Sequence, residues 1–566
     1  MDYADRQSPG LLGWLRKYDR AALSPDVIAG LTAAAVVLPK AMAYATVASL
    51  PVQIGLYAAL VPPIVYAALG RSAVLSVSTT TTLAILTGSA LSEAVPGGDA
   101  AHLATAAATL AVLVGLALLA AALLRFGFVA NFISEPVLAG FKAGIGAVII
   151  VDQLPKLLGF HIDKVGFFRD VLTIARTAGE TSLPTLFVSA GAFAAILGLK
   201  RWVPRFPAAL AAVALGIGAS AIFGLPALGV KTIGAIPSGL PSLAHIDLAL
   251  FEALWPAALA IALMSFTETI ASERAFAAPG DPRPAPNQEL VATGLANVFG
   301  GLFGAMAAGG GTSQTLVNQR AGARTQLAGF VVGCAAVATV LFLAPAMSLM
   351  PQAVLAAIVV AYSAELLDLH EFRTIGAIRQ TELWWAVTGF AGVLLLGTLR
   401  GIGVAVIVSI LSLAYQASNP AVYEIARKPG TSVFRRRSEE HPDDEAYPGL
   451  LMIRVEGRIF FGNTERVLDL VKPLVEARDP KIIVLDCSAI FDFEYSALKM
   501  LSEVEKRVRS RGAELWLAAL NPQALRGVER SALGAALGRE RMLLDLEHAA
   551  SRYRGEASPD GKHLQS

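Results

Sequence analysis

Long apolar runs constrain this chain more than any other feature of its sequence. A bilayer core of about 30 Å takes roughly 20 residues of α-helix, and apolar runs of that order recur from Val27 to Ala417. Two further segments, 77–92 and 312–320, are too polar at one end for ordinary spans. The directly recognisable runs are 27–48, 54–69, 103–124, 135–151, 183–199, 207–223, 253–271, 289–304, 326–349, 351–367, 382–399 and 401–417. They predict an all-α polytopic membrane domain.

The charges are distributed as if the chain met two different solvents. Residues 421–566 carry 46 of the 90 charged residues, which leaves 44 for the first 420 positions. The charged share of the whole chain is 16%, whereas about a quarter of the residues of soluble domains are charged. The net charge of +2 offers no basic surplus for a nucleic-acid partner. We therefore expect a membrane domain over 25–420, embedded in the lipid bilayer, followed by a soluble one.

Positive charges predict the orientation, because Lys and Arg in short loops stay in the cytoplasm. Residues 1–24 lack a signal-peptide pattern and are expected to form a cytoplasmic arm. If 77–92 and 312–320 count as spans, the basic loops fall on the side of this arm. This agreement favours fourteen segments in the cell (plasma) membrane, with both termini in the cytoplasm. The basic residues are Arg71, Arg125, Lys200, Arg201, Arg205, Arg274, Arg283, Arg320, Arg324, Arg373 and Arg379.

Fourteen segments divide into seven and seven, and the two irregular segments come third in each half. Short or interrupted segments at matching places of two halves are typical of inverted-repeat transporters, whose binding site lies where the repeats meet. Sequence identity between the halves is too weak to identify a repeat directly. The pattern therefore favours a transporter with its site between the segments 77–92 and 312–320.

The two irregular segments have the composition of helices that begin inside the membrane. Each begins with small residues, continues with Ser and Thr that can cap backbone amides, and ends apolar. Free amides and the positive end of the helix dipole suit an anion. The alternative is that Ser, Thr and Gly only allow close helix packing in lipid. The expected substrate-binding residues are Ser78, Thr79, Thr80, Gly311, Thr312, Ser313 and Gln314.

Two ionisable residues stand out within the predicted spans. Lys40 lies about ten residues from either flank of its span, and with Tyr44 it joins the expected substrate site. Glu268, with Ser265 and Thr269 on the same helix face, is the expected ion-coupling group. A buried charge is costly in the membrane, so its default interpretation is functional. The alternative is a structural Lys–Glu pair, and we expect Lys40 and Glu268 to neutralise each other in the empty pocket.

The chain after Tyr447 changes character. A charged, Pro- and Gly-rich linker over 421–447 leads into short apolar strands that alternate with helices, which predicts a small α/β domain over 448–556 and a tail over 557–566. Neither a Walker motif, HExxH nor GxSxG occurs, and the two cysteines, Cys334 and Cys487, cannot form a multi-cysteine metal site. We expect no enzyme activity, no cofactor and no metal.

Four stretches of this chain carry a resemblance to the sulfate permease family (SulP, solute carrier family 26). They are VLPKAMAYATVASLPVQIGLYAALVPPIVYAALG (37–70), NQELVATGLANVFGGLFGAM (287–306), AGARTQLAG (321–329) and DCSAIFDFEYSAL (486–498). The resemblance covers nearly the whole chain. It implies the seven-plus-seven inverted-repeat fold shared with uracil transporters, with a core and a gate domain, a cytoplasmic STAS domain and a homodimer.

The family pattern also identifies positions at which this chain departs from it. Lys40 stands where the family usually has Gln, and Gln314 stands where many animal members have Arg. The fixed positive charge has therefore moved across the pocket, which puts the family's list of substrates in doubt here. Ser496 matches a phosphorylatable position of bacterial anti-sigma antagonists and is the candidate regulatory residue. The alternative for that domain is a plain docking module.

The resulting expectation is secondary active transport of a small inorganic oxyanion, sulfate being the first choice, coupled to protons. A bicarbonate or C4-dicarboxylate transporter coupled to sodium is the alternative. A membrane-tethered signalling protein and a passive chloride channel are less favoured, because neither needs both half-helices together with Lys40 and Glu268.

Overall fold

A computed structural model covers the chain and describes residues 15, 18–131, 134–162, 166–203, 207–234, 239–276 and 285–555. Most of the expected cytoplasmic arm, the tail over 557–566, Arg205 and Arg283 lie outside the described residues. The chain divides into two compact units, residues 1–410 and 411–566.

The first unit consists of helices apart from one two-stranded ribbon. The helices are η3 (Arg20–Ala22), α1 (Leu23–Val47), α2 (Val52–Ala58), α3 (Val61–Leu69), α4 (Thr81–Ala94), α5 (Ala100–Leu123), η4 (Phe126–Asn131), α6 (Glu135–Leu158), α7 (Phe167–Thr177), η5 (Ala178–Glu180), α8 (Leu183–Trp202), α9 (Ala208–Phe223), η6 (Leu225–Leu228), η7 (Leu248–Leu250), α10 (Phe251–Phe276), α11 (Pro286–Leu302), α12 (Thr312–Arg320), α13 (Leu327–Ala338), the π-helical η8 (Thr339–Leu343), α14 (Ala344–Met347), α15 (Gln352–Ser363), η9 (Ala364–Leu366), α16 (Leu369–Ile378), α17 (Gln380–Leu396) and α18 (Thr398–Ser418). The ribbon strands are β1 (Val77–Ser78) and β2 (Gly309–Gly310).

A helix lies at each of the fourteen segments expected from the sequence. Among the described residues, nine helical stretches are long and apolar enough to cross a membrane. The two polar segments give the short helices α4 and α12. Helix α4 begins inside the predicted segment 77–92, whereas α12 has the predicted bounds 312–320. The prediction of an all-α polytopic membrane domain is confirmed.

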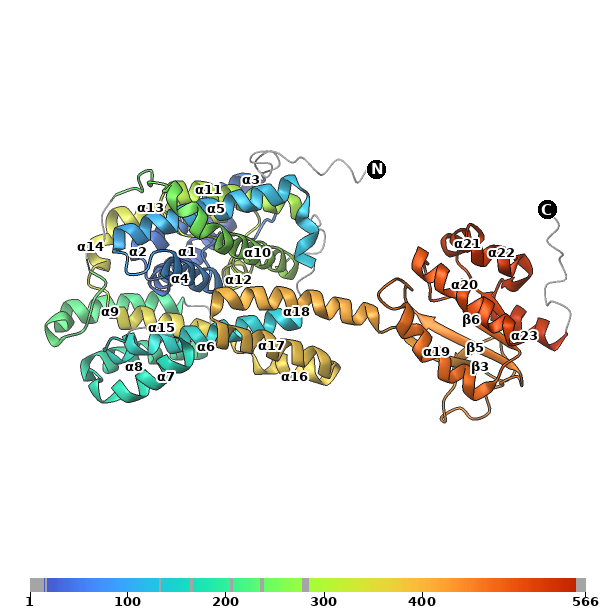
Figure 1. Cartoon of the computed structure of the whole chain (residues 1–566). Helices are drawn as coiled ribbons and strands as arrows, with labels where there is room; N and C mark the ends of the chain where they lie inside the picture. Colours follow the sequence, from blue (N-terminus) through green and yellow to red (C-terminus); the bar gives the residue numbers. More distant parts are fainter. Residues whose placement is uncertain are drawn as a thin grey trace. The chain divides into compact units, whose positions relative to one another are not determined.

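The helices of the first unit form two lobes, the upper and lower groups of its ribbon in Figure 1. The core lobe contains α1–α5 and α10–α14, in which α5 packs on α11 and α1 on α13. The flanking lobe contains α6–α9 and α15–α17, in which α6 packs on α15 and α17. Each lobe therefore combines helices from both halves of the chain.

The second unit is a mixed sheet with helices. Its strands are β3 (Ala421–Arg427), β4 (Phe434–Arg436), β5 (Leu450–Glu456), β6 (Ile482–Asp486), β7 (Glu514–Ala518) and β8 (Met542–Leu543), in the spatial order β4-β3-β5-β6-β7-β8. Strands β5 to β8 are parallel, whereas β3 pairs antiparallel with β4 and β5. Its helices are α19 (Thr464–Arg478), α20 (Tyr495–Ser510), α21 (Pro522–Glu529), α22 (Ala532–Leu537), η10 (Arg539–Arg541) and α23 (Leu546–Arg554). The predicted small α/β domain is confirmed.

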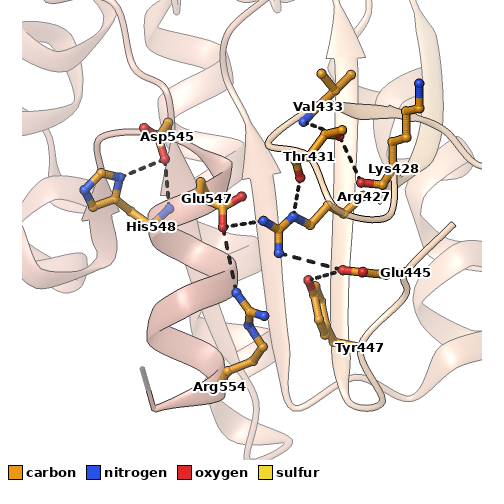
Figure 2. A network of polar contacts seen from close by, with 10 residues as sticks. All are labelled: Arg427, Lys428, Thr431, Val433, Glu445, Tyr447, Asp545, Glu547, His548 and Arg554. Atoms are coloured by element: carbon orange, nitrogen blue, oxygen red, sulfur yellow. Dashed lines mark hydrogen bonds and ion pairs between the residues drawn. The ribbon is translucent and has the colours of Figure 1, made fainter. Parts of the chain in front are cut away.

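The stretch 421–447 differs from the linker predicted there. Its first seven residues form β3, which runs beside β5 from Ala421 opposite Glu456. Arg427 at the end of β3 pairs with Glu547 of α23 at 3.0 Å and donates from Nε to the carbonyl of Thr431 at 2.6 Å (Figure 2). The charges that suggested a solvated linker therefore form ion pairs at the edge of the sheet.

Candidate functional site

A two-stranded ribbon joins the two short helices of the core lobe. Strand β1 precedes α4 and strand β2 precedes α12, and the strands pair antiparallel with Val77 opposite Gly310. Gly311 N also donates to the carbonyl of Ser76 at 3.1 Å. The two segments that the sequence singled out, more than 200 positions apart, therefore meet in the core lobe.

Helix α4 begins with a side-chain cap that also contacts an acid. Thr80 is its N-cap, and Thr80 Oγ1 accepts from Leu83 N at 3.3 Å, which satisfies one of the free amides of the first turn. The same hydroxyl donates to Glu268 Oε2 at 2.8 Å. Glu268 of α10 is buried, so the predicted coupling acid lies directly at the start of the predicted half-helix.

Helix α12 begins without any side-chain cap. Its N-cap is Gly311, and the next two residues, Thr312 and Ser313, are exposed. Gln314 closes the other side, because its Oε1 accepts from Ser78 Oγ at 2.7 Å and its Nε2 donates to the carbonyl of Thr79 at 3.2 Å. The first turn of α12 therefore has uncapped amides beside a polar wall, as an anion site requires.

Glycine before α12 allows the ribbon to lie against α10. A Cβ at Gly310 would come within 2.8 Å of the backbone Cα of Thr269. Ser265 Oγ donates to the carbonyl of Ala308 at 2.7 Å, and Thr269 Oγ1 accepts from Gly310 N at 2.9 Å. Ser265 and Thr269, which were expected to share the ion-coupling role of Glu268, therefore bond to the ribbon.

One hydroxyl at the site has no partner. Thr79 Oγ1 is buried and makes no hydrogen bond within the described part of the chain. Buried polar atoms are rarely left without a partner, because each costs about 1–3 kcal/mol. This atom lies on the residue before the cap of α4, where a bound ligand would satisfy it.

Lys40 contacts an aromatic ring and not the acid with which it was expected to pair. Its ammonium lies 3.6 Å from the centroid of the Tyr362 ring of α15, and no ion pair between Lys40 and Glu268 occurs among the described residues. The cation that acts most strongly on Glu268 is Lys142 of α6. The expected neutralisation of Lys40 by Glu268 is wrong, because the helix packing places an aromatic face from the flanking lobe at Lys40.

Tyr44 lies between the surroundings of Lys40 and those of Glu268. It is buried on α1 one turn beyond Lys40, and its electrostatic neighbours include Glu268 and Glu365. The substrate residues expected from the sequence therefore form one group around α4 and α12, with Tyr44 leading from it toward Lys40.

Sequence reasoning missed three residues of this interface between the lobes. Lys142 stands within the apolar run 135–151, where its charge was a readable signal. Tyr362 and Lys200 had no such signal, because an aromatic residue in a span and a lysine at a span end are both ordinary. Their positions depend on the packing of α8 and α15.

The fold and this site define a class of protein. It is a polytopic membrane protein in which two short helices begin next to each other within the helical unit, and that unit is followed in the chain by a small α/β domain. The chain belongs to the sulfate permease family, whose model matches residues 23–389. The model of the STAS domain matches residues 441–545.

Relatives of known description cover almost the whole chain. A protein of Mycobacterium tuberculosis described as a probable sulfate transporter is 32% identical over 552 residues, which span 97% of this chain and 98% of that protein. The chloroplastic sulfate transporter 4.1 of Arabidopsis thaliana is 28% identical, over 100% of this chain and 85% of its own.

Solved structures share the fold at lower identity. The murine Solute Carrier 26 family member A9 anion transporter, in an inward-facing state, matches with a TM-score of 0.86 at 21% identity, over 96% of this chain and 93% of its own. The transmembrane domain of a cyanobacterial bicarbonate transporter, BicA, matches with a TM-score of 0.60 at 22% identity, over 69% of this chain and 98% of its own.

Proposed function

We propose that this protein carries a small inorganic oxyanion, sulfate first, across the cell membrane together with a proton. The observation that carries the proposal is the contact of Thr80, the cap of α4, with Glu268. It connects the start of a half-helix, where an anion would bind, to an acid that can take up a proton. The sulfate transporters among the relatives support the choice of substrate.

The anion would be held by polar groups from two helices. The uncapped amides of α12 and the free hydroxyl of Thr79 are the donors, and Gln314 orients the two helix starts. Lys40 and Lys142 add positive charge from the interface of the lobes. Preorganised donors of this kind bind an anion without the large desolvation cost of a fully buried ion pair.

Coupling follows from the shared hydroxyl of Thr80. An anion at the start of α4 brings a negative charge close to Glu268, so the neutral, protonated form of Glu268 becomes more favourable. Anion and proton then favour each other's binding by the same factor, since linkage is reciprocal. The net charge that must cross the membrane is reduced as well, because the proton offsets part of the charge of the anion.

The test is anion affinity against pH in purified protein. Wild type should bind sulfate more tightly at lower pH, whereas Glu268→Gln should bind sulfate without a pH dependence, because the amide resembles the protonated acid. Thr80→Val, which removes the hydroxyl and keeps the shape, should weaken both the binding and its pH dependence. An unchanged pH dependence in Glu268→Gln would contradict the mechanism.

Sodium coupling is the rival, and the contacts at α10 weigh against it. A sodium site needs several oxygen ligands, as hard cations generally do. The hydroxyls of Ser265 and Thr269, the nearest candidates on α10, are already bonded to the ribbon. A strict sodium requirement for uptake at fixed pH would select the rival.

Bicarbonate remains the second substrate to test, since BicA shares the fold. Uptake by proteoliposomes of labelled sulfate, bicarbonate and a C4-dicarboxylate, each at two imposed pH gradients, separates these substrates. We expect the protein to act as a homodimer with both termini in the cytoplasm, which cross-linking and protease accessibility in vesicles can test.

A further inference from the structure

One aromatic ring of the flanking lobe lies beside two lysines. The centroid of the Tyr362 ring is 3.6 Å from Lys40 Nζ and 4.3 Å from Lys200 Nζ. The two nitrogens are therefore at most about 7.9 Å apart, the sum of these distances. Lys40 comes from α1 of the core lobe and Lys200 from the last turn of α8, so the ring lies where the lobes meet.

The two lysines differ in their partners. Lys200 Nζ lies 2.7 Å from Glu365 Oε1 of η9, and the side chains are 32% and 52% exposed. Lys40 is buried, and within the described residues it forms no ion pair. An exposed pair of this kind contributes little stability, so Glu365 can be displaced at low cost. The buried charge of Lys40 lies against the face of an aromatic ring, a weaker partner than an anion, and it interacts with Glu365 only through its electrostatic field.

The carboxylate of Glu365 therefore occupies the place of an oxyanion. It offers an oxygen to an ammonium at 2.7 Å, the distance of a charge-assisted hydrogen bond. If a free oxyanion took its place, that anion would lie beside Lys200 and close to Lys40, and so near two positive charges.

We infer that Lys200 is a second anion-binding position beside Lys40, which small oxyanions enter by displacing Glu365, and that Tyr362 positions both lysines. This inference rests on the proposed function and adds a selectivity to it. Two positive charges match a divalent oxyanion, whereas one is sufficient for a monovalent one. Lys200 thereby favours divalent over monovalent substrates.

The electrostatic argument predicts a ratio that a purely structural lysine would not produce. The energy of an anion near a fixed charge is proportional to the charge of the anion. Removal of the Lys200 charge should therefore lower the affinity for sulfate by a factor that is roughly the square of the factor for nitrate. An example is about tenfold for sulfate and about threefold for nitrate. Lys200→Arg keeps the charge and should retain the selectivity.

The experiment measures sulfate and nitrate affinity in the full-length protein for wild type, Lys200→Gln, Lys200→Arg and Glu365→Gln. Glu365→Gln removes the competing carboxylate and should raise the affinity for both anions. Lys231→Gln, a change at an exposed lysine on the connection before η7, is the matched control and should leave both affinities unchanged. Elution volume and thermal stability establish that each variant is folded.

Tyr362 is tested separately as a positioning residue. Tyr362→Phe keeps the ring face and should retain the ratio of sulfate to nitrate affinity, whereas Tyr362→Leu should lower that ratio. An unchanged ratio in Tyr362→Leu would refute the role of the ring.

Equal losses for the two anions in Lys200→Gln, no loss for either, or weaker binding in Glu365→Gln would each overturn the role of Lys200. A wild-type protein that binds neither anion would instead refute the proposed function, so the two failures are distinct.

Discussion

Gln314 is the residue on which the geometry of the site depends most. Its amide is bonded to the side chain of Ser78 and to the backbone of Thr79, so it connects the start of α12 to the segment before α4. Its side chain carries no charge, and its contribution here is therefore positional rather than electrostatic.

Gln314→Ala should weaken anion binding about tenfold, equal to about 1.4 kcal/mol, because the two helix starts lose their link and Ser78 loses a partner. Isothermal titration with sulfate measures the change. Gln319→Ala on the same helix is the control, since Gln319 is exposed and its side chain, among the described residues, donates to the carbonyl of Phe276 away from the site. Equal effects of the two substitutions would show that helix stability, not the site, is responsible.

Two neighbouring glycines should respond differently to alanine. A Cβ at Gly311 would meet the side-chain nitrogen of Gln314 at 2.3 Å, whereas one at Gly310 would meet the backbone of Thr269 at 2.8 Å. A side chain can move and backbone cannot. Gly311→Ala should therefore fold normally and bind anion weakly, while Gly310→Ala should lose about 1–3 kcal/mol of stability. Thermal unfolding in detergent, measured beside sulfate binding, tests both; a stable Gly310→Ala protein would contradict the close approach.

At the scale of elements, helix α4 of the core lobe also contacts α18. Ser89 Oγ lies 2.6 Å from Thr398 Oγ1, and Glu93 pairs with Arg400 at 3.4 Å. These contacts lie near the end of α4 farthest from its site. A transporter that exposes its site alternately to the two sides of the membrane must break the contacts that close the site on one side. The contacts of Ser89 with Thr398 and of Glu93 with Arg400 are candidates for contacts of this kind.

A disulfide between Ser89→Cys and Thr398→Cys should stop transport on oxidation and release it on reduction. Of the two native cysteines, Cys334 is exposed and is replaced by serine so that it cannot form a competing disulfide. Cys487 can stay, because burial raises the pKa of its thiol and keeps it unreactive. Labelled sulfate uptake before and after reduction is the measurement. Full transport in the cross-linked protein would mean that α4 and α18 move together.

The sequence predicted which helices and strands exist better than it predicted which of them contact each other. The apolar runs predicted where helices of the first unit lie, and the Ser-, Thr- and Gly-rich segments identified α4 and α12, because these features are local. The partners of Lys40 and Glu268 depend on which lobe faces each helix, so a pairing inferred from charge alone was wrong. Strand β3 was missed because its ion pairs with distant acids resemble the charge of a solvated linker.

At the scale of the whole molecule, the soluble unit begins earlier than its family match. The matched region starts at residue 441, yet β3 from Ala421 covers the edge of β5. An uncovered β5 would present a row of free backbone groups and a hydrophobic edge for association.

A fragment over 421–555 should therefore unfold cooperatively and remain monomeric, whereas a fragment over 448–555 should aggregate. Circular dichroism on heating and light scattering distinguish them. A monomeric, cooperatively unfolding shorter fragment would mean that β3 is dispensable for the domain.

Within the folded unit, Ser496 lies in the first turn of α20 and Arg458 pairs with Asp492 and Glu494 just before it. The positive end of the helix favours a phosphate at this position, while the two acids oppose it. Ser496→Glu should therefore change transport rate and leave the order of substrate preference unaltered, as a panel of labelled anions would reveal. A changed order would place Ser496 in the substrate path.

The ribbon of β1 and β2 also has a consequence for synthesis. Ser76 N donates to Thr315 Oγ1 across 239 positions of sequence, and a ribosome adding roughly 5–20 residues per second needs roughly 12–48 seconds to make that length. During this interval the start of α4 is already synthesised and its pairing strand is not. The segment before α4 therefore has no pairing partner until the second half of the chain is made, so the synthesis of that half is the step that completes assembly of the site.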